Sequence, residues 1–161
     1  MISAEILNPQ PNEYVLDLCA APGGKATQIA AAMRGTGVFA ANEPDAARAK
    51  VLRANLERMG AGYAVVTNAY PDALTHTWSG FFDAIQCDAP CSGEGMFRRD
   101  PDARAQWSPS SPAGCAKRQA EILDRAAELL APGGRIVYST CTFNMEENEN
   151  TIRAFLARHP D

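Results

Sequence analysis

The sequence predicts an α/β fold with a mostly parallel, doubly wound sheet. Short apolar runs bounded by turn residues alternate along the chain with longer stretches of helical periodicity. This alternation is typical of βαβ units, in which a helix crosses over between two parallel strands. The runs expected to form buried strands are residues 14–19, 37–41, 63–67, 82–87 and 135–139.

Helical periodicity predicts helices between these strands, at residues 26–33, 45–59 and 114–131. Gly60 supplies a stop for the second of them. The third is preceded by Ser111 and Pro112, which suit a turn that starts a helix, and the run from Pro132 to Gly134 cannot continue it. Its expected buried face consists of Ile122, Leu123, Ala126, Leu129 and Leu130.

A last helix is expected over residues 144–158. Asn144 is suited to cap its first turn, and Glu147, three residues on, is suited to return the hydrogen bond as in a capping box.

The 161 residues suit one domain, and a hydrophobic fraction of 46% suffices for a core. No run approaches the roughly 20 apolar residues that span a bilayer, and the N-terminus has no signal-peptide pattern. We therefore expect a cytoplasmic protein without a membrane partner. Its oligomeric state is open, with a monomer as the default.

The net charge of −4 argues against binding nucleic acid by bulk electrostatics. Basic residues do gather in one part of the sequence, where they suit either a local nucleic-acid contact or a solvated face. These are Arg98, Arg99, Arg104, Lys117 and Arg118.

Five cysteines, an odd number scattered among the predicted elements, indicate reduced thiols rather than a disulfide framework. With only two histidines, no spacing matches a zinc site, and no metal is expected. We expect Cys87 and Cys115 in the core, and Cys19 to contribute only its backbone to a site. Cys91 and Cys141 each follow a predicted strand, where open α/β sheets build their sites.

A glycine-containing loop, residues 20–25, joins the first predicted strand to a helix, so Gly23 and Gly24 would let the backbone approach a ligand. Glu43 lies about 20 residues farther on at the next strand end, where an acidic residue binds ribose hydroxyls in doubly wound folds. The helix dipole also favours an acidic residue there, and both roles can hold together. Asn68, after the third strand, is placed to meet an adenine edge.

The segments CAAPGGKA, DAPCSGEGMFRRDP and STCTFNMEENE together resemble the NOL1/NOP2/Sun family of RNA cytosine methyltransferases, most closely its bacterial ribosomal-RNA members. The resemblance spans nearly the whole chain. It implies a Rossmann-like methyltransferase fold, S-adenosylmethionine as cofactor and RNA, in particular ribosomal RNA, as partner. The cofactor residues that it implies are Cys19, Ala20, Ala21, Pro22, Gly23, Gly24, Lys25, Glu43, Asn68 and Asp88. Asn68 stands where the family usually has Asp.

The resemblance also implies a covalent mechanism, because carbon 5 of cytosine becomes nucleophilic once a thiolate has added to carbon 6. Cys141 would make this attack, and Cys91 would help to remove the carbon 5 proton. Asp88 would hydrogen-bond the ring near nitrogen 3 and the amine. Lys25 would lower the pKa of Cys141 or orient the base. DNA cytosine methyltransferases suggest the alternative that the thiol of the Pro-Cys motif, here Cys91, attacks.

Methyltransferases of this class resemble one another in having seven strands, and this sequence predicts five. Residues 1–161 are therefore expected to be a catalytic domain without its N-terminal extension, last strands and accessory RNA-binding domain. Two alternatives stay open: a cofactor-binding piece that is inactive alone, and a cytosine methyltransferase acting on DNA or tRNA. An amino-group or small-molecule methyltransferase is disfavoured, because its Asn/Asp-Pro-Pro-aromatic motif is absent where DAPC stands.

Overall fold

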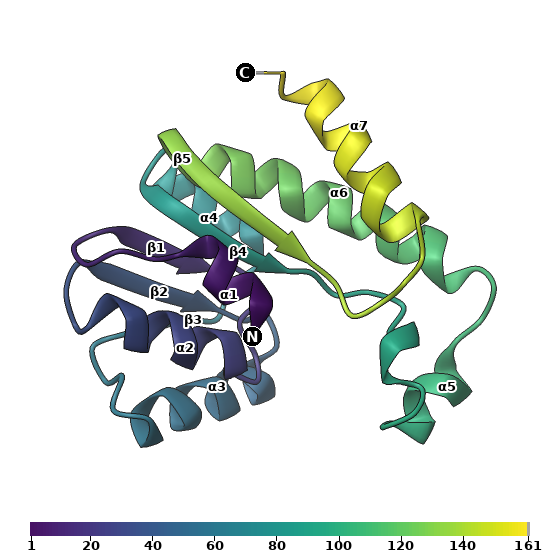
Figure 1. Cartoon of the computed structure of the whole chain (residues 1–161), viewed down its shortest axis with the longest axis horizontal. Helices are drawn as coiled ribbons and strands as arrows, with labels where there is room; N and C mark the ends of the chain where they lie inside the picture. Colours follow the sequence, from purple (N-terminus) through teal and green to yellow (C-terminus); the bar gives the residue numbers. More distant parts are fainter. Residues whose placement is uncertain (161) are drawn as a thin grey trace. The chain divides into compact units, whose positions relative to one another are not determined.

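The computed structural model describes residues 1–160, which form two compact units. The first contains Met1–Asp88 and Arg125–Tyr138, and the second contains Ala89–Asp124 and residues 139–160. Helices and strands alternate along most of the chain (Figure 1). The elements up to the fourth strand are α1 (Ile2–Leu7), β1 (Tyr14–Asp17), α2 (Gly24–Met33), β2 (Val38–Asn42), α3 (Ala46–Arg58), β3 (Val65–Thr67), α4 (Pro71–Trp78) and β4 (Phe82–Asp88). They are followed by the 3-10 turn η1 (Glu94–Met96), α5 (Pro101–Gln106), α6 (Ser111–Leu129), β5 (Leu130–Ser139), the π-helix η2 (Glu146–Asn150) and α7 (Thr151–Arg158).

The sheet has five strands in the order β3-β2-β1-β4-β5, which confirms the predicted strand count and the doubly wound α/β class. β1 pairs in parallel with β2 on one side and β4 on the other, and β2 pairs in parallel with β3. The chain moves outward from β1 to β3 and then returns to the other side of β1. The order therefore reverses between β1 and β4, and ligands bind at the carboxyl ends of such a strand pair.

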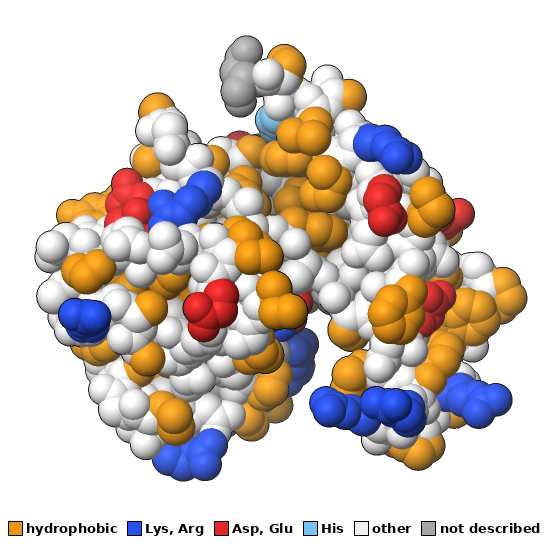
Figure 2. All heavy atoms as spheres, in the orientation of Figure 1, with side chains coloured by type: hydrophobic (Ala, Val, Ile, Leu, Met, Phe, Trp, Pro, Cys, Tyr) orange, Lys and Arg blue, Asp and Glu red, His pale blue; other side chains and the backbone are white. Residues whose placement is uncertain are grey.

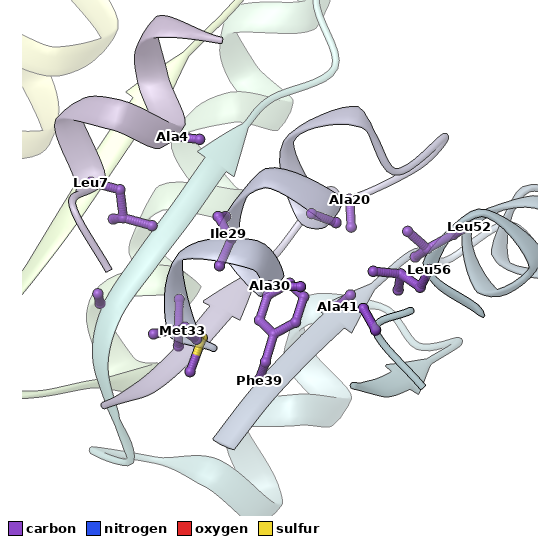
Figure 3. Close-up of a cluster of buried hydrophobic side chains, with 14 residues drawn as sticks. Ala4, Leu7, Ala20, Ile29, Ala30, Met33, Phe39, Ala41, Leu52 and Leu56 are labelled. Atoms are coloured by element: carbon purple, nitrogen blue, oxygen red, sulfur yellow. The ribbon is translucent and has the colours of Figure 1, made fainter. Parts of the chain in front are cut away.

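One face of the sheet is covered by α1, α2 and α3, whose apolar side chains meet those of the strands in a single cluster (Figure 3). In this view the Phe39 ring of β2 points toward Ala30 of α2, and Ala41, also of β2, lies on the side of Leu56 of α3. Alternate strand residues face opposite sides of a sheet, so the buried Leu16 and Ile85, which lie outside this cluster, belong to the other face.

Capping and stop residues explain where the predicted helices begin and end. The Asp45 side chain accepts a 2.8 Å hydrogen bond from the Arg48 backbone and caps α3, as its place in the sequence predicts. Gly60, just past that helix, has φ +78°, the conformation that favours glycine at a helix stop. The helix predicted over residues 114–131 begins three residues earlier than expected, at Ser111, so Ser111 and Pro112 lie in its first turn and not in a turn before it.

Other boundaries differ from the prediction. The long helix ends at Leu129, and Leu130 already begins β5, so residues 132–134 lie within a strand and do not follow a helix end. At Gly134 a Cβ would lie 2.9 Å from the Asp83 carbonyl oxygen of β4, so the sequence uses glycine for close strand approach there. The short helices α1, α4 and α5 are absent from the prediction.

The last helix also begins differently. Asn144 does cap, accepting a 2.8 Å hydrogen bond from the Glu146 backbone, but the next turn is the π-helix η2. Glu147 does not return a bond to Asn144, because its side chain is buried and accepts a bond from the Ser92 backbone. The predicted capping box is therefore wrong. Within residues 1–160, no helix combines the length and the apolar character that crossing a membrane requires.

Candidate active site

In the first unit, the predicted glycine loop follows β1 and leads into α2. Gly23 has φ +113°, and a Cβ there would lie 3.3 Å from the Leu52 side chain. Both the backbone conformation and the close packing against Leu52 therefore favour glycine at this position. α2 begins at Gly24 without a side-chain cap from Gly23. The first backbone N–H groups of a helix have no intrahelical partner and are suited to meet a ligand's polar groups.

Two side chains of α3 hold this loop by its carbonyl oxygens. Arg48 donates to Ala21 O at 3.2 Å, and Asn55 donates to Pro22 O at 2.7 Å. Neither residue was predicted from the sequence as part of the site. Their spacing of seven places them on one helix face two turns apart, and this is the signal that could have found them.

Glu43 directly follows β2 and is 2% exposed. Its carboxylate accepts a 3.0 Å bond from the Asp45 backbone and lies 3.3 Å from a guanidinium nitrogen of Arg48. Because Arg48 also holds Ala21, the acidic side chain and the glycine loop share one partner. The predicted ribose-binding residue and the predicted cofactor loop therefore belong to one hydrogen-bonded assembly.

Asn68 uses its amide nitrogen to hold the segment after β2. The nitrogen donates to the carbonyl oxygens of Glu43 at 2.8 Å and Pro44 at 2.9 Å. A primary amide has two N–H hydrogens, so these two bonds use both and leave Oδ1 as the group that can accept from a ligand. Asn68 can thus present an acceptor, as the Asp usual in the family would, while also tying down the Glu43 segment.

At the end of β4, Asp88 accepts a 2.5 Å bond from the Lys25 ammonium group. Lys25 lies in the first turn of α2, so this ion pair joins the glycine loop to the strand on the other side of the reversal in strand order. The two residues predicted to orient the base are therefore in direct contact. Both remain partly exposed, at 21% and 33%.

Asp17 ends β1 beside this pair and was missed by the sequence analysis. Its side chain is fully buried, and neither carboxylate oxygen has a hydrogen-bond partner of normal geometry among residues 1–160. Burial raises the pKa of Asp17 from 3.8 to about 7, and the nearby Asp88 adds to this rise. Lys25 and the Cys19 backbone N–H lower the pKa, with smaller effects.

In the second unit, the two predicted reactive cysteines lie together. Their sulfur atoms are 3.2 Å apart, although 50 residues separate them in the sequence. The Cys141 backbone N–H also donates to the Cys91 sulfur at 3.3 Å. Cys141 is exposed and Cys91 is half-buried, so Cys141 offers the more accessible thiol.

Either sulfur can donate the hydrogen bond that joins the pair. When Cys91 is a thiolate the Cys141 thiol is the donor, and this bond lowers the pKa of Cys91 to about 7, from an ordinary value of 9.0. Burial opposes this effect, while the backbone N–H groups of Cys141 and Gly93 add to it. The negative charge of Glu147 raises the pKa of Cys91 and has the smallest effect. A substantial fraction of Cys91 is therefore thiolate near neutral pH, which is the form that reacts.

Two contacts fix the loops that carry these thiols. The Gly95 N–H donates to Cys141 O at 2.8 Å, and a Cβ at Gly95 would lie 2.5 Å from that oxygen, so only glycine permits this approach. The hydroxyl groups of Ser92 and Thr142 are 3.1 Å apart, one residue beyond each cysteine.

The other cysteines are placed partly as predicted. Cys87 is fully buried in β4, which confirms its place in the core, and a hydrogen bond with Cys19 followed by burial raises its pKa well above 9.0. Cys115 is only half-buried, so its assignment to the core is wrong. It lies in the first turns of α6, where it is partly exposed, and partial burial raises its pKa.

The basic residues noted in the sequence are all exposed. Arg98, Arg99 and Arg104 are exposed, and Figure 2 shows Lys and Arg side chains gathered on the face that carries α5. Lys117 and Arg118 are exposed on α6. In the part of the chain that the structure describes, no three His, Cys, Asp or Glu side chains group as metal ligands would.

These features define a class of protein: a doubly wound α/β fold with a nucleotide-type loop at its strand reversal, in a chain whose second unit carries a pair of thiols in hydrogen-bond contact. A family model described as 16S rRNA methyltransferase RsmB/F matches residues 4–161. The chain belongs to this RsmB/F family.

Curated relatives agree with this assignment. Ribosomal RNA small subunit methyltransferase F of Cronobacter sakazakii is 51% identical over 146 residues, which are 91% of this chain and 30% of the relative. The protein of the same name in Klebsiella pneumoniae is 48% identical over 153 residues, or 95% of this chain and 32% of that protein. The chain thus spans about a third of the length of these relatives.

Solved structures show the same fold. The crystal structure of PH0851 matches 99% of this chain and 36% of its own, with a TM-score of 0.94 and 35% identity. NSun6 from Pyrococcus horikoshii, solved with SFG, matches 98% of this chain and 40% of its own, with a TM-score of 0.88 and 28% identity. The fold is therefore the Rossmann-like methyltransferase fold, as the resemblance implied.

We predict that Asp17→Asn stabilises the protein in a pH-dependent way. Because the folded-state pKa of Asp17 is raised from 3.8 to about 7, the folded protein holds a proton that the unfolded chain loses as pH rises through that window. Asp17 therefore costs stability progressively from about pH 4 to pH 7, and the full cost persists above pH 7. The upper bound, for a shift of about three units, is about 4 kcal/mol.

Urea unfolding at several pH values measures this difference. The gain of Asp17→Asn over the unmodified protein should be near zero at pH 4 and reach a plateau above pH 7, while Asp102→Asn, at an exposed site, should show no such trend. A gain that does not vary with pH would contradict the raised pKa.

We also predict that Cys91 reacts with iodoacetamide with a midpoint near pH 7, and that Cys141→Ala moves this midpoint upward toward 9. The reason is that Cys141 supplies the largest effect that lowers the pKa of Cys91. Mass spectrometry of the alkylated peptides across pH gives the midpoint for each cysteine. Cys115, whose pKa is raised, serves as the internal control. An unchanged Cys91 midpoint in Cys141→Ala would show that the thiol pair does not set it.

Proposed function

We propose that residues 1–161 are a methyltransferase catalytic domain that transfers a methyl group from S-adenosylmethionine to carbon 5 of a cytosine in ribosomal RNA, through a covalent cysteine adduct. The observation that carries this proposal is the Cys91–Cys141 pair, with its sulfur atoms 3.2 Å apart and the pKa of Cys91 lowered to about 7. Membership in the RsmB/F family and the names of the relatives support ribosomal RNA as the substrate class.

The residues of the first unit fit the cofactor. Gly23 gives the loop a backbone conformation, with φ +113°, that other residues rarely adopt, Glu43 can accept from ribose hydroxyls, and Oδ1 of Asn68 can accept from the adenine amine. The cofactor supplies an electrophilic methyl group on a sulfonium. The protein's own contribution here is a loop whose carbonyl oxygens are held by Arg48 and Asn55, so that it keeps its shape when no ligand organises it.

The thiol pair supplies the covalent chemistry. As the Cys141 sulfur attacks carbon 6 of cytosine, its proton passes to the Cys91 sulfur, which already accepts a hydrogen bond from it. Carbon 5 becomes nucleophilic and takes the methyl group. Cys91 then returns its proton to solvent, removes the proton from carbon 5, and Cys141 leaves carbon 6 as the double bond re-forms. The enzyme is regenerated with both thiols unmodified.

Asp88 and Lys25 serve the base in this proposal. Asp88 hydrogen-bonds cytosine near nitrogen 3 and its amine, and a proton shared between the carboxyl group and nitrogen 3 neutralises the negative charge that develops there when carbon 6 is attacked. The Lys25 ammonium holds the Asp88 carboxylate in place through their 2.5 Å contact. A cytosine within structured RNA must leave its stack to reach these groups.

The cofactor assignment predicts saturable binding of S-adenosylmethionine in a calorimetric titration. Glu43→Gln should weaken it by about 10- to 100-fold, because a hydrogen bond to a charged acceptor contributes about 1.5 to 3 kcal/mol. Glu57→Gln, at an exposed acid on α3, is the matched control and should leave the affinity unchanged. Unchanged affinity in Glu43→Gln would reject its ribose contact. No binding by the unmodified chain would favour the alternative that it is inactive alone.

The roles of the thiols predict opposite effects of two substitutions. With small-subunit ribosomal RNA and S-adenosylmethionine, Cys91→Ala should accumulate a denaturant-stable protein–RNA adduct, because attack is slowed but continues with solvent taking the Cys141 proton, whereas release is blocked. Cys141→Ala should form none. Denaturing gel electrophoresis with labelled RNA measures the adduct. The reverse pattern would assign attack to Cys91. Running the assay also on a polypeptide as long as the curated relatives shows whether this chain suffices alone.

A further inference from the structure

A buried polar cluster in the second unit surrounds the backbone of Cys91. Gln119 of α6 and Glu147 of the π-helix η2 are both fully buried. Gln119 donates one amide hydrogen to Pro90 O at 3.0 Å and the other to the Glu147 carboxylate at 2.9 Å. The same carboxylate oxygen accepts from the Ser92 N–H at 2.9 Å. The residues immediately before and after Cys91 are therefore both held.

The next residue of the π-helix holds Cys141 in the same way. Asn148 accepts from the Thr140 hydroxyl at 2.7 Å and donates to Thr142 O at 3.3 Å, so it binds the residues on both sides of Cys141. It also donates to Asn144 O at 2.8 Å. Two adjacent residues of one helical turn thus bind the flanks of two cysteines that are 50 residues apart in sequence.

The chemistry of the pair requires this precision. The Cys141 thiol can lower the pKa of Cys91 and pass on its proton only while the two sulfur atoms stay within hydrogen-bond reach. Buried, hydrogen-bonded side chains hold a reacting group better than solvated ones, because they have few alternative partners. π-helical turns, which are rare in proteins, are found frequently at functional sites.

We propose that Glu147 and Asn148 are positioning residues that together set the separation of the two thiols, Glu147 by fixing Cys91 and Asn148 by fixing Cys141. This inference rests on the proposed function for its effect on catalysis. Its geometric part, the separation of the thiols, stands on the contacts of the second unit alone.

Thiol reactivity tests the geometric part without RNA. Glu147→Leu and Asn148→Leu remove the hydrogen bonds, and each should raise the pH midpoint of Cys91 alkylation from about 7 toward 9 as the sulfur atoms separate. Glu149→Leu, at an exposed acid of the same turn, is the control and should keep the midpoint. A midpoint that stays near 7 in both variants, with cooperative urea unfolding preserved, would overturn the proposal.

Glu147→Gln keeps the test decisive if the leucine variants do not fold. The titratable groups that face Cys91 are Cys141, Glu147 and, from α6, Cys115. Glutamine can still accept from Ser92 and Gln119 but carries no charge, so the thiols should stay together and the Cys91 midpoint should fall. A rise in this variant toward the value of Cys141→Ala would show that hydrogen bonding through Glu147 does not suffice to hold the pair.

RNA adducts test the catalytic part. Glu147→Leu displaces Cys91 and should slow release by about 100-fold, the size of effect that a displacement of about 1 Å can produce, and should slow attack less because solvent can also take the Cys141 proton, so the covalent adduct accumulates. Asn148→Leu should instead slow adduct formation, and Glu147→Gln should restore release. Equal effects of both leucine variants on both steps would indicate general loss of structure and overturn the assignment. If the unmodified protein forms no adduct, the proposed function fails, while the alkylation experiment still decides the positioning role.

Discussion

The parallel pairing of β1 with β4 is the constraint on which the candidate cofactor site depends. Val15 pairs with Ala84, Leu16 with Ile85 and Asp17 with Gln86, and the register continues past β1 through the bond from the Leu18 N–H to Gln86 O. This register brings the ends of the two strands to one edge of the sheet. The glycine loop and Asp88, which are distant in sequence, therefore meet there, and Lys25 can reach Asp88 across the reversal in strand order.

The same register places Asp17 at a buried position, where an ionised carboxylate is energetically unfavourable. A buried carboxylate without hydrogen-bond partners is unfavourable, and its pKa of about 7 expresses that cost. Burial and the repulsion from Asp88 raise this pKa more than Lys25 lowers it. Such an arrangement does not serve stability. Perturbed acids beside an ion pair are typical of functional sites, so Asp17 belongs with the Lys25–Asp88 pair as part of one charged group at the strand ends.

Features set by residues close together in the sequence could be predicted, whereas hydrogen bonds between distant residues could not. Strand ends are marked locally, by apolar runs that stop, and this allowed Glu43, Asn68, Cys91 and Cys141 to be placed at the edge of a sheet. The direction of the Asn68 amide could not be predicted, because its partners, Glu43 O and Pro44 O, lie 24 or 25 residues away. Arg48 and Asn55 were missed for the same reason, since they bind loop carbonyls about 30 residues earlier.

Glu147 shows why a local pattern can mislead. Asn144 followed by Glu147 has the spacing of a capping box, and on local grounds that interpretation is sound. The tertiary contacts with Ser92 and Gln119 bury the carboxylate instead, and the turn widens to a π-helix. A buried acid forms two hydrogen bonds there that a solvated cap could not match in strength.

Contacts within the second unit are sufficient to lower the pKa of Cys91 without a cation. A Lys or His beside a cysteine is a common way to lower a thiol pKa, and Lys25 was a candidate for this task. In the structure Lys25 is engaged with Asp88, and the pKa of Cys91 is lowered by the Cys141 thiol and by two backbone N–H groups. A hydrogen bond from one thiol to the other activates Cys91 only while Cys141 keeps its proton. Ionising one sulfur therefore disfavours ionising the other, and in the proposed mechanism this coupling is consistent with attack by one thiol and release by the other in separate steps.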